Sequence, residues 1–179
     1  VLGFSSVEQG EQQWRNLLHV VDVRSGKCSA LRSDKGTEAT YIRGVEVSSS
    51  KRYFIVLLRD QPFEVWDARS MALVGVVKLG GRVTAIAWCP LRGAAVNAGG
   101  EERLVATTPD GQFHHLGVQG GSISRHFSRT DREVGTVTAI AWKGRFLVTG
   151  DTSGTIATWD FDAKKGKLIT TSLGMVRRI

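Results

Sequence analysis

The stretch at residues 135–160, GTVTAIAWKGRFLVTGDTSGTIATWD, decides the fold because its pattern predicts three short strands separated by tight turns. Its first part, VTAIAW, is largely apolar at both alternating sets of positions, which is typical of a strand buried on both faces. Lys143-Gly144 and Ser153-Gly154 then supply turn residues, and the second of these pairs predicts a hairpin that leads to Trp159. So small a sheet cannot bury its own faces, and we therefore expect further copies to pack against it.

Two independent markers repeat along the chain. The six letters VTAIAW recur at 83–88, and looser versions begin at Ile42 (IRGVEV) and Val176 (VRRI). The Trp-Asp pair that closes the stretch recurs as Trp66-Asp67, and Val21-Asp22 and Leu116-Gly117 stand at the same place in the pattern. Because both markers keep the same phase, they predict tandem units of about 40–50 residues.

Tandem four-stranded units of this length predict an all-β fold, a fragment of a β-propeller with three complete blades and parts of two more. The predicted complete blades cover residues 42–78, 83–127 and 136–172, blade pieces fall in 1–32, and a further blade starts at 175–179. A closed propeller has about four to eight blades. We therefore expect the chain to be part of a longer protein.

The aromatic residues at strand ends are predicted to be structural. Burying one Trp side chain between blades removes about 150–250 Å² from water, so such a residue is expected in the core and not on a ligand platform. The residues assigned this role are Trp66, Asp67, Trp88, Trp142, Trp159 and Asp160.

The sequence offers no arrangement of residues suited to catalysis. It contains no nucleophile elbow, no phosphate-binding glycine loop and no metal-ligand spacing, so we predict no enzyme, no cofactor and no metal. His114 and His115 are adjacent on a strand and should point to opposite faces, and His19 has no Cys or His neighbour in the pattern. Cys28 and Cys89 would fall in different blades, which favours a reducing, cytoplasmic setting.

The chain is basic, with a formal net charge of +7. In a propeller blade, the turns between the first two strands and between the last two emerge on one face, where we expect the cations to gather, with a neutral or negative opposite face. Such a face would suit an acidic peptide or an anionic membrane, or would only keep the protein soluble. The candidate partner-binding residues are Arg24, Lys27, Lys51, Arg52, Arg69, Lys143, Lys164, Lys165 and Lys167.

Nucleic acid is the alternative partner for a basic chain. Base stacking requires exposed aromatic side chains between the cations, whereas the strand pattern directs most aromatic residues here to the core. A nucleic-acid-associated or chromatin scaffold is therefore kept as the alternative to a protein-binding scaffold.

Over essentially its whole length the chain resembles the WD-repeat propellers. The resemblance rests on WD dipeptides that close strands, on Asp-Gly or Ser-Gly turns ahead of them, and on the repeat length. The Gly-His pair that usually precedes the first strand is missing, since Gly80-Gly81-Arg82 and Glu133-Val134-Gly135 stand in its place. We therefore expect an incomplete histidine–aspartate hydrogen-bond network and less regular blades.

A closer likeness within this family is carried by HVVDVRSGK from His19, LLRDQPFEVWDARS from Leu57, TVTAIAWKG from Thr136 and GDTSGTIATWDF from Gly150. These stretches are similar to the second propeller of a large two-propeller cytoplasmic scaffold that tethers vesicles at the trans-Golgi. The resemblance implies a non-catalytic scaffold, with acidic cargo peptides and a subunit of a tethering complex as partners. It also implies peripheral association with vesicle or trans-Golgi membrane.

Overall fold

The computed structural model describes residues 2–8, 14–32, 42–59, 62–90, 100–130, 135–160, 165–170, 174–177 and 179. The regular structure of these residues consists of strands, which form four antiparallel sheets. The first sheet contains β1 (Leu2–Glu8), β2 (Trp14–Val21) and β3 (Cys28–Arg32). The second contains β4 (Ile42–Val47), β5 (Tyr53–Leu58), β6 (Phe63–Asp67) and β7 (Ala72–Val77). The third contains β8 (Ala85–Trp88), β9 (Glu102–Thr107), β10 (Gln112–Gln119) and β11 (Ser122–Thr130), and the fourth β12 (Val137–Lys143), β13 (Phe146–Asp151), β14 (Thr155–Asp160) and β15 (Lys165–Thr170).

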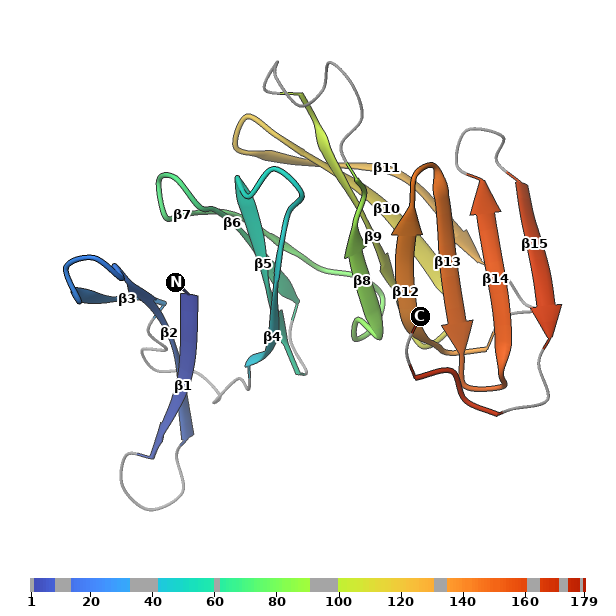
Figure 1. The fold of residues 1–179 in the computed structure, drawn as a ribbon, viewed down its shortest axis with the longest axis horizontal. Helices are drawn as coiled ribbons and strands as arrows, with labels where there is room; N and C mark the ends of the chain where they lie inside the picture. The colour runs from blue at the N-terminus through green and yellow to red at the C-terminus, as the bar shows by residue number, and fades with distance from the viewer. Residues whose placement is uncertain are drawn as a thin grey trace.

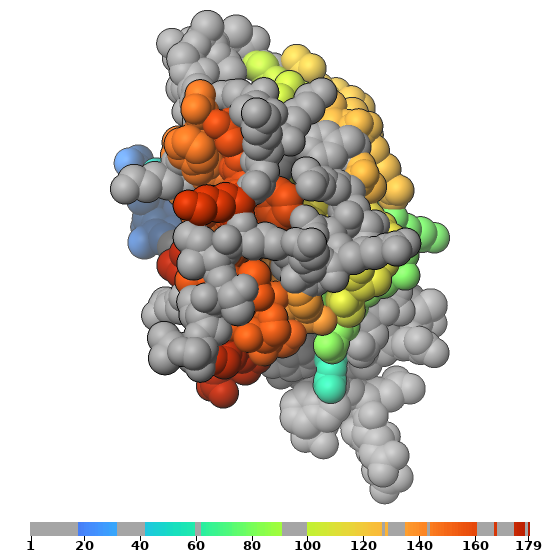
Figure 2. All heavy atoms as spheres, turned by 90° about the vertical axis from the view of Figure 1, so that its right-hand side faces the viewer, coloured from blue at the N-terminus to red at the C-terminus, as the bar shows by residue number. Residues whose placement is uncertain are grey.

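Each sheet pairs its strands in chain order, as the blade of a propeller does. Figure 1 shows the sheets following one another across the molecule, from the blue β1–β3 sheet to the orange and red β12–β15 sheet. Figure 2 looks onto the β12–β15 side, where described atoms of that sheet lie at the surface. The prediction of a propeller fragment with three four-stranded blades is confirmed.

The hydrophobic core lies between the sheets. One cluster joins the β4–β7 and β8–β11 sheets and includes Ile55 and Leu104, which are both fully buried. Two further clusters fill the other two junctions, around Leu147 on one side and around Leu18 and Phe54 on the other. Because the β4–β7 sheet contributes to the core on both of its faces, the strand β5, YFIVLL, is apolar at every position.

The predicted structural tryptophans lie at these junctions. Trp66, Trp88 and Trp159 are buried, and Trp142 is half-buried and packs against the cluster around Leu147. The Trp66 ring stacks on Phe54 with ring centres 6.3 Å apart, and Trp159 contacts Phe113.

Several local boundaries differ from the sequence-based expectation. β1 continues to Glu8, and β11 continues to Thr130 through residues expected to be a loop. β15 begins at Lys165, so Lys165 and Lys167 lie within a strand and not in the turn before it. Residues 175–177 form no strand, although the backbone N–H of Val176 donates to the carbonyl of Asp151. Among the described residues, no helix is long and apolar enough to span a membrane.

Candidate protein-binding surface

The turns of the molecule emerge at two opposite ends of the sheets. The β4–β5, β6–β7, β10–β11 and β12–β13 turns lie at the upper edge of Figure 1, and the β9–β10 and β13–β14 turns lie at the lower edge. We call the first end, together with the β2–β3 turn, the turn face. The second end, which also holds the described link between β7 and β8 (residues 78–84), is called the link face.

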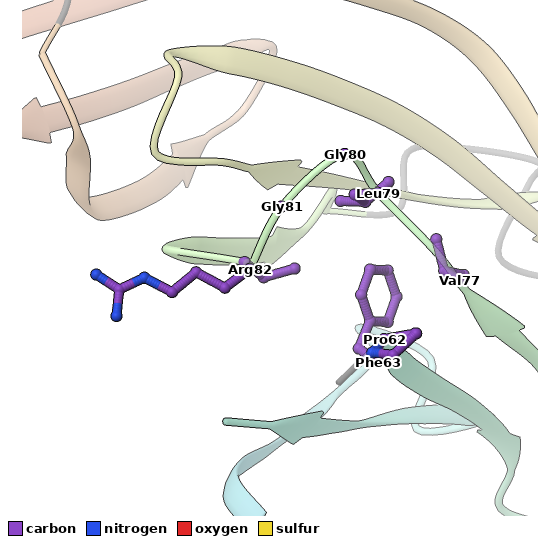
Figure 3. Close-up of a pocket in the computed structure, with 8 residues that line it drawn as sticks. Pro62, Phe63, Val77, Leu79, Gly80, Gly81 and Arg82 are labelled. Carbon is purple, nitrogen blue, oxygen red and sulfur yellow. The ribbon is translucent and has the colours of Figure 1, made fainter. Parts of the chain in front are cut away.

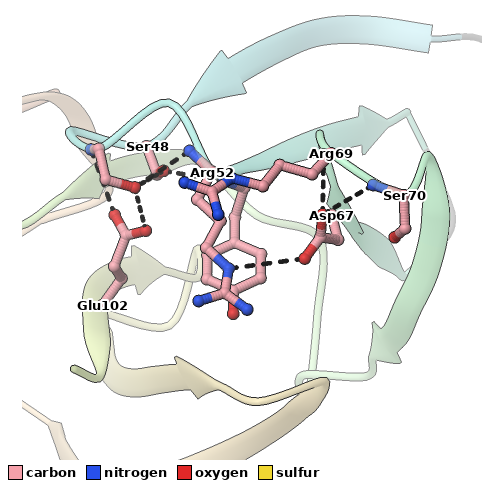
Figure 4. Close-up of polar contacts among 8 residues, drawn as sticks. Ser48, Arg52, Asp67, Arg69, Ser70 and Glu102 are labelled. Carbon is pink, nitrogen blue, oxygen red and sulfur yellow. Dashed lines mark hydrogen bonds and ion pairs between the residues drawn. The ribbon is translucent and has the colours of Figure 1, made fainter. Parts of the chain in front are cut away.

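Aspartates shape the tight turns of the turn face. Asp22 accepts hydrogen bonds from the backbone N–H of Arg24 at 2.9 Å and from the hydroxyl of Ser25 at 2.8 Å. Asp67 accepts from the backbone N–H groups of Arg69 and Ser70 at 2.8 and 3.1 Å (Figure 4). Burial opposes the charge on Asp67, but these donors and Arg52 hold the pKa of its carboxyl below the ordinary value. The Asp of the Trp-Asp pair is therefore a turn-shaping residue.

Ion pairs connect neighbouring turns on this face. The Nε of Arg52, in the β4–β5 turn, lies 3.6 Å from a carboxylate oxygen of Asp67 (Figure 4). In the last sheet, Arg145 of the β12–β13 turn pairs with Asp160 at 3.0 Å. The two pairs repeat one arrangement, a cation of the first turn against the Asp that ends the third strand. Arg52 is therefore partly neutralised within its own blade.

The predicted partner-binding cations are only partly brought together. Arg24, Lys27, Lys51 and Arg69 are exposed in three turns of the turn face. Lys167 is exposed, but it pairs with Thr158 in the β14–β15 ladder and so belongs to the outer strand. Lys164 and the side chains of Lys143 and Lys165 lie outside the described residues.

On the link face, Asp151 organises the β13–β14 turn. Its carboxylate is fully buried and accepts from the backbone N–H groups of Gly135, Ser153 and Thr155 at 2.7–2.9 Å. Burial would raise its pKa, yet these bonds hold the pKa below the ordinary value. The backbone N–H of Gly135 thus donates a hydrogen bond to Asp151, near the place where the histidine of the usual Gly-His pair is missing. Trp159 donates separately to the hydroxyl of Thr149 at 3.3 Å.

The two adjacent histidines have separate surroundings, as their strand positions require. His114 lies 3.1 Å from the hydroxyl of Ser128, whereas the ring of His115 is 5.0 Å from that of His126. Burial, with help from the charges of His126 and Arg103, lowers the pKa of His115 to about 4. Among the described residues, no group of three or more His, Cys, Asp or Glu side chains could hold a metal ion.

Sequence analysis missed three cations that lie on or near the link face. Lys78 and Arg82 belong to the segment between β7 and β8, and Arg43 lies near the start of β4; all three are exposed. The opposite face therefore carries more positive charge than predicted, and among its described acids Asp151 is buried. The signal was available, since blade-to-blade links were expected on this face, but Lys78 and Arg82 were not counted there.

Comparison with known proteins places this geometry in context. The family model described as "WDR11 second beta-propeller" matches residues 1–99. Over 213 aligned residues the chain is 31% identical to WD repeat-containing protein 11 of Mus musculus and 28% identical to that of Danio rerio. Each alignment covers 92% of this chain but 17% of the relative. A chain of a solved structure entitled "Crystal Structure of Mitotic Checkpoint Complex" matches with a TM-score of 0.68 at 21% identity, covering 90% of this chain and 46% of that one.

Four sheets paired in chain order, with Trp-Asp pairs at the ends of β6 and β14, define a WD-repeat β-propeller fragment. The family matched by the chain has a non-catalytic scaffold fold. Within that class, the chain belongs to the family of the WDR11 second β-propeller. It spans about a sixth of the length of the curated relatives it matches.

Proposed function

We propose that this segment is a protein-interaction scaffold whose turn face binds acidic peptide segments of partner proteins. In this proposal the partners are cargo proteins with acidic tails and a subunit of a vesicle-tethering complex. The protein would act in the cytoplasm, at the surface of vesicles or of the trans-Golgi network. The family supports a scaffold role, and the charge of the turn face supports the choice of ligand.

The observation that carries the proposal is the excess of cations on three turns. Residues 22–27, 48–52 and 67–71 contain five Arg and Lys residues against two carboxylates, and both carboxylates accept hydrogen bonds within their own turns. Four of the five cations are exposed. A concentrated positive field on rigid turns speeds the encounter with an acidic chain and selects against basic ones.

A charge reversal on the turn face tests this proposal. Lys51→Glu combined with Arg69→Glu should weaken binding of a fluorescein-labelled Asp/Glu-rich peptide by about tenfold or more and reduce its salt dependence, because both exposed cations are replaced by anions. Fluorescence anisotropy at several salt concentrations measures both effects. The matched control is Lys167→Glu, which reverses an exposed charge on the outer strand β15 and should change affinity little.

Unchanged affinity in the double variant, or an equal loss in the Lys167 control, would contradict the turn face as the binding surface. A steeply salt-dependent shift of a single-stranded oligonucleotide that exceeds peptide binding would favour the nucleic-acid alternative. In cells, the same double variant of a tagged protein tests the trafficking role through its recovery with vesicle and trans-Golgi membranes.

A further inference from the structure

A pocket opens on the link face where the 79–83 segment between β7 and β8 passes the start of β6. Its volume is about 250 Å³, and half-buried Leu79 and Val83 line it beside Phe63 and Val77, which are only 1% and 4% exposed (Figure 3). The Phe63 ring faces Val77 and Leu79, while the side chain of Arg82 extends away from them. A cavity of about 150 Å³ lined by apolar side chains can hold a benzene ring. This pocket therefore has room for one large aliphatic or aromatic side chain.

The pocket is built on a stable base. Phe63 and Val77 belong to the core cluster that joins the two sheets, and Leu79 and Val83 pack against it. Because opposite walls come from β6 and from the link between sheets, the shape of the pocket is set by the blade junction itself. Because these walls are already held in place, little conformational entropy is lost when a ligand enters, and this favours binding.

The backbone of the link adds polar groups beside the apolar wall. Gly80 and Gly81 line the pocket and are exposed, and a Cβ atom added at Gly80 would have nothing within 4 Å. Within the described part of the chain, their backbone N–H and C=O groups have no hydrogen-bond partner. An extended peptide lying across the link could pair with them.

Arg82 gives this site its charge. It lines the pocket, and its guanidinium forms no ion pair with any residue that the structure describes. A carboxylate of a ligand could therefore form charge-assisted hydrogen bonds with Arg82.

We propose that this pocket is a second peptide-binding site, which takes an extended segment of a partner protein with a large apolar side chain directly beside one or two carboxylates. The apolar side chain packs against Leu79 and Val83, and a carboxylate contacts Arg82. The site is on the opposite end of the sheets from the turn face and requires apolar as well as acidic residues. It does not depend on the function proposed for the turn face.

The test uses the intact protein and a defined probe. A fluorescein-labelled 12-residue peptide with Asp-Leu-Glu at the centre of a Gly/Ser frame should bind, and binding should fall about tenfold or more when its Leu is replaced by Ser. The variants Arg82→Glu and Leu79→Ser should each weaken binding of the Leu peptide by about tenfold or more. Lys167→Glu, which reverses an exposed charge on the outer strand β15, should leave it unchanged. The requirement for Leu in the peptide separates this site from the turn face.

A charge swap shows whether weaker binding by Arg82→Glu results from the lost charge or from loss of folding. Arg82→Glu should gain affinity for the peptide in which the two acidic residues are replaced by Lys, a result that an unfolded variant cannot give. Equal binding of the Leu and Ser peptides, unchanged affinity in Arg82→Glu, or no binding at about 1 mM peptide would each overturn the proposal. Arg82-dependent binding of a single-stranded oligonucleotide in preference to the peptide would overturn it as well.

Discussion

At the scale of single residues, an exposed and a buried aspartate both fix the backbone of a turn by accepting hydrogen bonds. Asp22 is exposed and shapes its turn with bonds to Arg24 and Ser25, whereas Asp151 is fully buried and accepts from three backbone amides. A buried carboxylate is stable only when its oxygens receive hydrogen bonds, and those bonds in turn fix the backbone that donates them. Asp151 thereby ties the start of β12 to the β13–β14 turn.

Replacement of Asp151 tests this role. Asp151→Ala should lower the free energy of unfolding by about 2–4 kcal/mol, because several backbone donors near the turn lose their acceptor in a buried site. Asp22→Ala, at an exposed turn, should cost clearly less, since water replaces the lost acceptor. Urea unfolding of both variants measures the difference. Equal costs for the two changes would contradict the assignment.

The buried histidines predict a dependence of stability on pH. His115 has a folded pKa of about 4 against an ordinary value of 6.5, and burial lowers the pKa of His114 as well. Below pH 6.5 the unfolded chain binds a proton that the folded His115 refuses, so stability falls as pH falls from 6.5 towards 4. Between pH 7 and 5 we expect His115 to contribute a loss of about 2 kcal/mol.

Urea unfolding at pH 7, 6 and 5 measures this loss. Asp151 and Asp67 interfere little because their pKa values are lowered, and Glu46, whose pKa burial raises, is present in both the parent protein and the variant below. His115→Leu should flatten the dependence, whatever it does to stability at pH 7. An equally steep dependence in the variant would assign the effect to other groups.

At the scale of strands and turns, the sequence predicted which strands form better than it predicted where they begin and end. The VTAIAW and Trp-Asp patterns located β8, β12, β6 and β14, because alternation and turn residues are local signals. The extra length of β11 and the start of β15 at Lys165 depend on pairing with the neighbouring strand, which no local pattern encodes. The Gly135–Asp151 bond likewise spans 16 residues and could be found only in three dimensions.

A glycine in β13 makes the docking of a distant segment possible. A Cβ atom on Gly150 would lie 2.3 Å from Cγ1 of Val176, whose backbone N–H donates to the carbonyl of Asp151 at 2.9 Å. Gly150→Ala should therefore displace the 174–177 segment and speed hydrogen exchange of the Val176 amide by about tenfold or more. Adding Val176→Gly to Gly150→Ala should restore part of the protection, since it removes the clashing methyl groups and also the Cβ atom of Val176, which the new Cβ would meet as well.

Gly44 supplies the matched control for this experiment. A Cβ atom on Gly44 would have nothing within 4 Å, so Gly44→Ala should leave exchange of the Val176 amide unchanged. Full protection in Gly150→Ala would show that the segment is not held against β13.

At the scale of the whole molecule, polar contacts supplement the apolar junctions between sheets. The buried carboxylate of Glu102, at the start of β9, accepts from the hydroxyl of Ser50 in the β4–β5 turn (Figure 4). The indole of Trp88 donates to the carbonyl of Glu46 at 3.3 Å. Both contacts join the β4–β7 and β8–β11 sheets, whose junction also holds the core cluster with Ile55 and Leu104.

Two core leucines lie at two different junctions between sheets, so replacing each one tests one junction at a time. Leu104 and Leu147 are both fully buried leucines, but Leu104 packs between the β4–β7 and β8–β11 sheets, and Leu147 packs in the cluster joining the β8–β11 and β12–β15 sheets. Each change to Ala should cost about 2–5 kcal/mol through loss of contacts and a residual cavity. In a repeat protein each unit is stabilised mainly by its immediate neighbours.

Leu104→Ala should therefore speed hydrogen exchange in β5 and β9, whereas Leu147→Ala should speed it in β9 and β13 and change β5 much less. Amide exchange followed strand by strand measures this pattern. If both variants accelerate exchange equally in all four sheets, the sheets unfold as one cooperative unit and the nearest-neighbour expectation is wrong.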